Sequence, residues 1–198
     1  MKKKWIMFAA VCAFSCCLGL VGCDMGSNTG EYDALNAMLD ADYSQIVLTV
    51  TDTFDKNTSL TSEYTVKYST DTITVTYTVE RFNEASLDNP STDIKTTLTG
   101  EAVIEDGAIV SRSGDDIKLP VDIAKPRLTF NKKYFENVNL TGVNLKADVK
   151  NADAFLGSQV SCTGMKVSAT FLDVFYNINI SYTSAGGNKV EYKYVFTH

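Results

Sequence analysis

Histidine is nearly absent from this sequence of 198 residues, whose only histidine is the last residue, His198. Ser-His-Asp triads, Cys-His nucleophiles and His/Cys zinc sites all need a histidine inside the fold. A chain end is often frayed, so His198 is a poor candidate for these roles. The sequence also has no Gly-x-x-x-x-Gly-Lys phosphate loop. We therefore expect a protein that is not an enzyme, with no catalytic residue, no cofactor and no bound metal.

Paired carboxylates remain as candidates for acid–base chemistry. The pairs are Asp52 with Asp55, Glu105 with Asp106, and Asp115 with Asp116. All of them fall in predicted turns or strand ends, whereas a glycosidase needs two carboxylates on either side of a bound sugar. Calcium is a further alternative, since Asp52, Asp55 and Asn57 place oxygen ligands in one loop, but this spacing does not match an EF-hand. Solvated surface charge is the simpler interpretation.

Long apolar runs are scarce as well, and the one that occurs lies at the start of the sequence. Lysines at positions 2 to 4 precede an apolar stretch from Trp5 to Val21 that only Ser15 interrupts. This order of charge and apolar run is typical of a secretory signal peptide. The stretch ends in Leu20-Val21-Gly22-Cys23, which resembles the lipobox of bacterial lipoproteins: an aliphatic residue, two small or aliphatic residues, and the cysteine.

The lipobox resemblance covers about the first 24 residues and implies a lipid anchor. In that family the cysteine receives a diacylglyceryl group and a lipoprotein signal peptidase cuts before it, which maps lipidation onto Cys23. Residues 1–22 would then be the signal peptide, and residues 23–31 a polar, glycine-rich lipidated tether. Two or three acyl chains hold a protein stably at a membrane, here on the extracytoplasmic face of a cell membrane or outer membrane. The alternative is a plain transmembrane anchor or an ordinary cleaved signal.

The mature chain would be acidic and poor in cysteine. Removal of residues 1–22 leaves 176 residues and moves the formal net charge from −6 to −9, because three lysines and no acidic residue are lost. An acidic surface repels phosphate, so we expect no nucleic-acid partner. Only Cys162 would remain beside the lipidated Cys23, which excludes a disulfide within the fold. Cys162 lies in an alternating apolar run, which favours a small buried hydrophobe over a reactive thiol.

Alternation with a period of two dominates the mature sequence. Tyr64, Val66 and Tyr68 alternate with polar residues, and after Thr70-Asp71 the alternation resumes from Ile73 to Val79. This pattern predicts a hairpin of antiparallel strands with one packed face and one solvated face. Further strands are predicted near residues 46–51, 98–104, 143–149, 165–171, 174–182 and 190–196, with a return strand beginning at Ile109.

Two short helices accompany the predicted strands. In the first, Tyr32–Ala41, the side chains of Leu35, Met38 and Leu39 share one face. Asn151 is a candidate N-cap for the second, which Gly157 ends. We predict irregular or edge structure for residues 115–126, and either a short helix or a loop for residues 131–142. The fold class is therefore mostly β (α+β), a curled antiparallel meander or half-open barrel in one domain over residues 32–198.

Two short motifs suggest an alternative organisation of this domain. Ser44-Gln45-Ile46 and Ser158-Gln159-Val160 each follow a candidate helix and open a strand and a hairpin, so the domain would consist of two related halves. The order of a helix and a long meander on a lipid anchor is also similar to the Lol-type lipoprotein carriers, most clearly over residues 130–196. That resemblance implies a half-open barrel packed around helices with an apolar cavity for acyl chains. It rests on no residue motif, so no functional residue is carried over.

We expect a lipid-anchored binding module for an apolar or lipid-like ligand. If the helices leave part of the apolar sheet face uncovered, that part becomes a cleft. Its candidate lining residues are Val66, Tyr77, Ile178 and Tyr192. The alternative is a structural or protein-interaction lipoprotein of the cell envelope with a filled core. The expected partners are thus the membrane, through the lipid on Cys23, and either an apolar ligand or an envelope protein.

Overall fold

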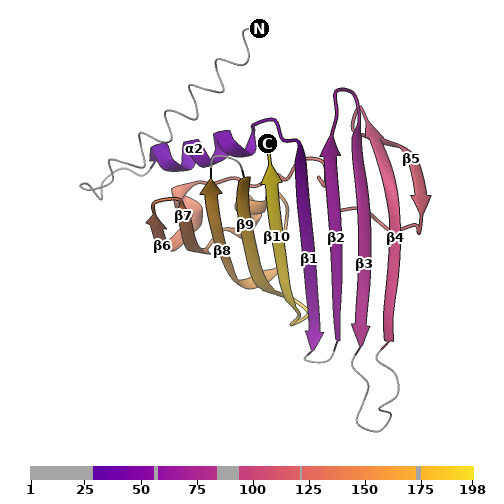
Figure 1. Ribbon diagram of the computed structural model, residues 1–198. Helices are drawn as coiled ribbons and strands as arrows, with labels where there is room; N and C mark the ends of the chain where they lie inside the picture. The colour runs from indigo at the N-terminus through magenta and orange to yellow at the C-terminus, as the bar shows by residue number, and fades with distance from the viewer. Residues whose placement is uncertain (1–28, 56–57, 84–93, 121, 173–174) are drawn as a thin grey trace.

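The computed structural model describes residues 29–55, 58–83, 94–120, 122–172 and 175–198 (Figure 1). The predicted signal peptide, Cys23 and most of the predicted tether lie outside these residues. Helix α2 begins at Thr29, within the range predicted as tether, and ends at Leu39, two residues before the predicted end. No helix in the described residues is long and apolar enough to cross a bilayer.

The described residues form one antiparallel sheet, as the period-two pattern predicted. This sheet has ten strands and does not close into a barrel. Its spatial order is β5-β4-β3-β2-β1-β10-β9-β8-β7-β6. The strands are β1 Gln45–Asp55, β2 Thr58–Tyr68, β3 Ile73–Asn83, β4 Ile94–Glu105, β5 Ala108–Gly114, β6 Phe135–Thr141, β7 Asn144–Val149, β8 Cys162–Leu172, β9 Phe175–Ser184 and β10 Lys189–Thr197. The predicted hairpin of residues 64–79 is β2 and β3, in register from Tyr68↔Ile73 to Thr58↔Asn83.

Two five-strand meanders meet at the centre of the sheet. The first runs outward from β1 to β5, and the second runs inward from β6 to β10. They join through β1 and β10, which pair antiparallel from Gln45↔Thr197 to Thr53↔Lys189. A connection of residues 115–134 carries the chain from the β5 edge to the opposite β6 edge. It contains only turns and the 3₁₀ helix Lys132–Tyr134 among its described residues.

Side chains alternate cleanly between the two faces of the sheet. One cross-strand row on the core face runs through eight strands: Leu145, Ala169, Ile178, Tyr194, Leu48, Tyr64, Tyr77 and Gly100. One residue further along each pairing, the row on the other face is Lys146, Ser168, Asn179, Lys193, Thr49, Glu63, Thr78 and Thr99. Because a shift of one residue would exchange these rows, the burial pattern fixes the register.

Helix α2, the connection and helix α3 (Ala152–Leu156) cover the core face. Tyr32, Leu35 and Leu39 of α2 are buried in the core, and Met38 packs beside them. Phe130 of the connection and Phe155 of α3 are among the most buried side chains and meet edge to face at 5.5 Å. Helix α3 has the predicted caps: the Asn151 side chain accepts from the backbone N of Ala154 at 3.1 Å, and Gly157 has φ +63°. Figure 1 shows α2 over the β6–β10 half of the sheet, with β5 at the opposite edge.

Candidate functional site

The β4–β5 hairpin forms one open edge of the sheet. Its two-residue turn is Asp106-Gly107, and both residues have positive φ, as a type I′ turn requires. Among the described strands, β5 pairs with β4 alone, and all seven of its residues are exposed. Ile109 and Val110 are 41% and 55% exposed. This edge therefore presents apolar side chains and backbone groups that have no neighbouring strand.

A tight corner turns the chain from β5 onto the core face. Gly114 has φ +82°, and a Cβ there would overlap the carbonyl oxygen of Thr99, so the corner needs glycine. The Asp115 carboxylate accepts a hydrogen bond from the backbone N of Thr99 at 2.8 Å, and the Asp115 N donates to the Thr99 O at 2.9 Å. The hydroxyl of Tyr77 donates to the carbonyl oxygen of Asp115. The connection is thus fixed to β3 and β4 where it begins.

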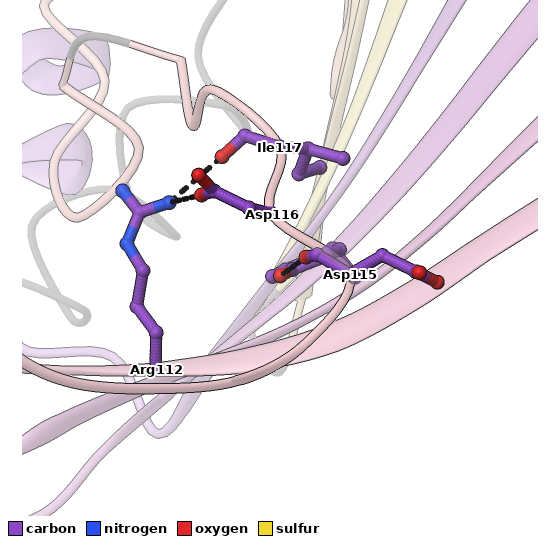
Figure 2. A network of polar contacts seen from close by, with 5 residues as sticks. Arg112, Asp115, Asp116 and Ile117 are labelled. Atoms are coloured by element: carbon purple, nitrogen blue, oxygen red, sulfur yellow. Dashed lines mark hydrogen bonds and ion pairs between the residues drawn. The ribbon is translucent and has the colours of Figure 1, made fainter.

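Arg112 of β5 lies beside this corner (Figure 2). Its Nη1 donates to Oδ1 of Asp116 at 2.7 Å and to the carbonyl oxygen of Ile117 at 2.9 Å. Figure 2 shows Nη1 turned toward these two acceptors, with the other guanidinium nitrogens on the opposite side. Within the described residues, neither Nε nor Nη2 of Arg112 makes a hydrogen bond. Nη1 therefore holds the guanidinium in place, while the N–H groups of Nε and Nη2 are left to bind another acceptor.

Further contacts hold the middle of the connection against β2 and α2. The Tyr68 hydroxyl donates to the carbonyl oxygen of Ala124, and burial raises the pKa of Tyr68 to about 12. Lys125 Nζ lies 3.1 Å from Oδ1 of Asp40, just after α2. The backbone N of Lys125 also donates to the carbonyl oxygen of Asp122 at 2.9 Å, which closes a turn. These contacts set the connection at a fixed place opposite β5.

A cleft of about 870 Å³ lies between the β4–β5 hairpin, residues 118–120 and 122–129 of the connection, and the end of α2. We call it the edge cleft. Its apolar lining is Leu39, Ile104, Ile109, Leu119, Pro120, Ile123, Ala124, Pro126 and Leu128. Its charged lining is Arg112, Lys118, Lys125, Arg127, Asp40 and Asp122. Four cations face two carboxylates, so the cleft is locally basic in a chain whose net charge is −6.

The four residues predicted to line a ligand cleft lie elsewhere. Val66 and Ile178 have no exposed surface and Tyr77 is 4% exposed, so all three belong to the filled core. Tyr192 is partly buried on β10 and stacks on Tyr182 and Tyr194, with ring centroids 6.1 and 6.4 Å away. The sheet brings the four onto one face, but none of them lines the edge cleft.

The remaining chemical candidates of the sequence are also dispersed. Asp115 and Asp116 hold the corner rather than face each other, since one is bonded to Thr99 and the other to Arg112. No group of three His, Cys, Asp or Glu residues that could hold a metal ion occurs in the described residues. Asn57 lies outside them. Cys162 is partly buried at the start of β8, where burial raises the pKa of its thiol.

Sequence reasoning missed Arg112 and Lys118 as site residues. Two of the three arginines of the chain, Arg112 and Arg127, fall within 16 consecutive residues that also hold Lys118 and Lys125. This cluster is the only signal that could have pointed to the cleft. Three aspartates in the same segment hide it, because they bring the charge of the segment close to zero.

No protein-family model matches the chain, and a search of curated proteins finds no significant match. The site is therefore defined by its own geometry: an open antiparallel sheet with a filled core, an edge strand paired on one side only among the described strands, and a basic cleft beside it.

Proposed function

We propose that this chain is a lipid-anchored, extracytoplasmic binding protein whose apolar or lipid-like ligand occupies the edge cleft. The lipobox-like sequence Leu20 to Cys23 supports the anchor. The observation that carries the binding role is the edge cleft itself, because its volume of about 870 Å³ falls within the usual range for small-molecule sites, roughly 300–1,000 Å³.

The apolar lining of the edge cleft supports an apolar ligand. Leu119, Ile123 and Leu128 are buried core residues that also reach the cleft surface. Each methylene that a ligand buries against them contributes about 0.8 kcal/mol, so six methylenes would contribute roughly 5 kcal/mol before the costs of binding. Elsewhere α2, the connection and α3 already cover the core face, which leaves the edge cleft as the preferred position.

A second function, protein interaction in the cell envelope, is supported by the β5 edge. Open sheet edges are commonly blunted by charge, bulges or a covering element. The β6 edge carries such a bulge, with Asn137 at φ +50° and a register shift between Glu136 and Asn139. The β5 edge also has a register shift, opposite Val103 and Ile104, but it exposes Ile109 and Val110, and an extended segment of another protein could add to it as a further strand.

Native mass spectrometry of the full protein, purified from the membranes of its own host, tests the first function. We expect a co-purified apolar or lipid-like molecule in the spectrum. Thr129→Trp should reduce its occupancy, because Thr129 is an exposed residue of the cleft lining and the indole would fill the space. Thr163→Trp is the matched control, since Thr163 is an exposed residue of β8 outside that lining.

Two results would contradict the binding role. One is a bare chain in the native spectrum of the parent protein, together with no uptake of added apolar probes. The other is equal ligand occupancy in Thr129→Trp and Thr163→Trp, which would place the ligand outside the edge cleft. A protein captured by the parent and lost on Val110→Lys would then favour the interaction function.

A further inference from the structure

Two nitrogens of the Arg112 guanidinium, Nε and Nη2, have no hydrogen-bond acceptor among the described residues. Nη1 of the guanidinium donates hydrogen bonds to Asp116 and Ile117, whereas the N–H groups of Nε and Nη2 form one side of the planar fork. Two parallel N–H groups in this arrangement match the two oxygens of a carboxylate or a phosphate. Arg112 also lines the edge cleft, which places its guanidinium in the same site as the apolar residues.

Arg112 is preorganised, which distinguishes it from a mobile surface cation. Its acceptors Asp116 and Ile117 directly follow Asp115, which is bonded to Thr99 and Tyr77. The side chain of Arg112 is 36% exposed, compared with 64% for Lys125 and 66% for Arg127. Binding of an oxyanion therefore orders less of the Arg112 side chain than it would of a free arginine.

The other charges of the edge cleft leave one further cation for a ligand. Lys125 is paired with Asp40 at 3.1 Å, and Arg127 with Asp122 at 2.9 Å. Lys118 is exposed and takes part in no ion pair among the described residues. An oxyanion bound by the Arg112 fork would therefore have Lys118 as the second cation of the same cleft.

We infer that the edge cleft binds amphiphilic anions, with the carboxylate or phosphate headgroup on Nε and Nη2 of Arg112 and the apolar tail against Leu119, Ile123 and Leu128. This inference rests on the proposed function and specifies its ligand class. The head would be recognised by charge-assisted hydrogen bonds and the tail by burial. Arg112 sets the requirement for an anion, and the apolar lining sets the requirement for a chain.

Titration calorimetry on the full lipidated protein in phosphatidylcholine nanodiscs tests the inference, with empty nanodiscs as the blank. The probes are octyl phosphate, octanoate, octanol and inorganic phosphate. We expect octyl phosphate and octanoate to bind at least about tenfold more tightly than octanol, as the loss of charge-assisted hydrogen bonds predicts. Inorganic phosphate should bind more weakly than octyl phosphate, because it has no tail.

Substitutions separate recognition from structure. Arg112→Gln should weaken octyl phosphate binding by about tenfold or more, and Arg112→Lys should restore only part of the loss, because an ammonium lacks the fork. Lys193→Gln, an exposed residue on the far sheet face, removes the same charge and should leave binding unchanged. Asp116→Asn tests the preorganisation: it weakens the contact that holds Nη1 but keeps the fork, so it should weaken octyl phosphate binding less than Arg112→Gln does.

The outcomes distinguish this inference from the proposed function. Octanol binding as tight as octyl phosphate binding, with no effect of Arg112→Gln, overturns the anion site and leaves the apolar cleft in place. If inorganic phosphate binds as tightly as octyl phosphate, the inference that the ligand is amphiphilic is overturned, and the ligand is a free anion. No binding of any probe, together with a bare chain from the host, overturns both.

Discussion

The Asn36 side chain forms two hydrogen bonds with the backbone of Phe130, 94 residues away. Its Nδ2 donates to the Phe130 carbonyl oxygen at 2.8 Å, and its Oδ1 accepts from the Phe130 N at 2.8 Å. The amide therefore pairs with one residue of the connection as a neighbouring strand would. This contact joins α2 to the connection at the edge cleft, whose lining includes Asn36.

Asn36→Asp should destabilise the protein although it preserves the shape of the side chain. The carboxylate keeps the acceptor for the Phe130 N but places an oxygen against the Phe130 carbonyl. We expect a loss of about 1–3 kcal/mol in the free energy of unfolding, measured by urea denaturation. Asn179→Asp, at an exposed position of β9, should change it little. Equal stability of the two variants would mean that α2 is not held by this contact.

Phe130→Ala should cost about 3–5 kcal/mol of unfolding free energy, because it leaves a cavity in the core. Phe130 is 1% exposed and contacts the rings of Phe135, Phe155 and Phe171 at centroid distances of 5.9, 5.5 and 6.5 Å. Val110→Ala, at a 55% exposed position, is the comparison and should fall within about 0.5 kcal/mol of the parent. A small effect of Phe130→Ala would show that the connection does not close the core.

Gly100→Ala should destabilise the sheet where β3, β4 and β5 meet. A Cβ on Gly100 would overlap the hydroxyl of Tyr77 and the carbonyl oxygen of Ser113. Overpacking of this kind costs typically about 1–3 kcal/mol, measurable as a lower midpoint of thermal unfolding. Gly30→Ala is the matched control, since no atom lies within 4 Å of its Cβ position in α2. That change should be neutral or stabilising, because alanine favours a helix.

Alkali should loosen the connection through Tyr68. Burial raises the pKa of Tyr68 from 10.0 to about 12, so the folded chain holds this proton at a pH where the unfolded chain has lost it. The contribution of Tyr68 to the free energy of unfolding is therefore fully present below about pH 10, and it is lost as the pH rises from about 10 to about 12. Urea denaturation across this window should show a shallower decline for Tyr68→Phe than for the parent. Identical slopes would exclude a contribution from Tyr68.

Cys23→Ser tests the lipid anchor. The serine variant should lose both lipidation and signal cleavage, so intact-mass spectrometry should show a heavier polypeptide without acyl chains. Cys17→Ser, inside the predicted signal peptide, should give the same mature mass as the parent. A Cys23→Ser protein with an unchanged mature mass would contradict the lipobox interpretation.

The strands could be predicted from the sequence because each has a solvated face and a packed face. In β2 and β3 the alternation from Tyr64 to Val79 predicted the hairpin and the buried side of Val66 and Tyr77. The caps of α3 could also be predicted, because Asn151 and Gly157 act on their immediate neighbours. These features depend on a few consecutive residues, whose periodicity and caps the sequence displays directly.

The edge cleft could not be predicted in this way, because it depends on where the connection lies over the sheet. Residues 115–134 have no periodicity, and their position is set by contacts with distant residues such as Tyr68 and Asn36. The sequence alone therefore could not show that Leu119 would close the core beside Arg112. For the same reason the sequence-based prediction chose Val66 and Ile178 as lining residues, although both lie on the covered face of the sheet.

The central pairing of β1 with β10 sets a condition on when this protein can fold. Gln45 pairs with Thr197, so the first and last strands must meet before the sheet is continuous. Contacts between residues so far apart in the chain form late and slow folding. Until β10 is available to pair, β1 of the N-terminal meander stays open on one side. A chain truncated before β10 would keep that open strand permanently, which makes it prone to proteolysis and aggregation.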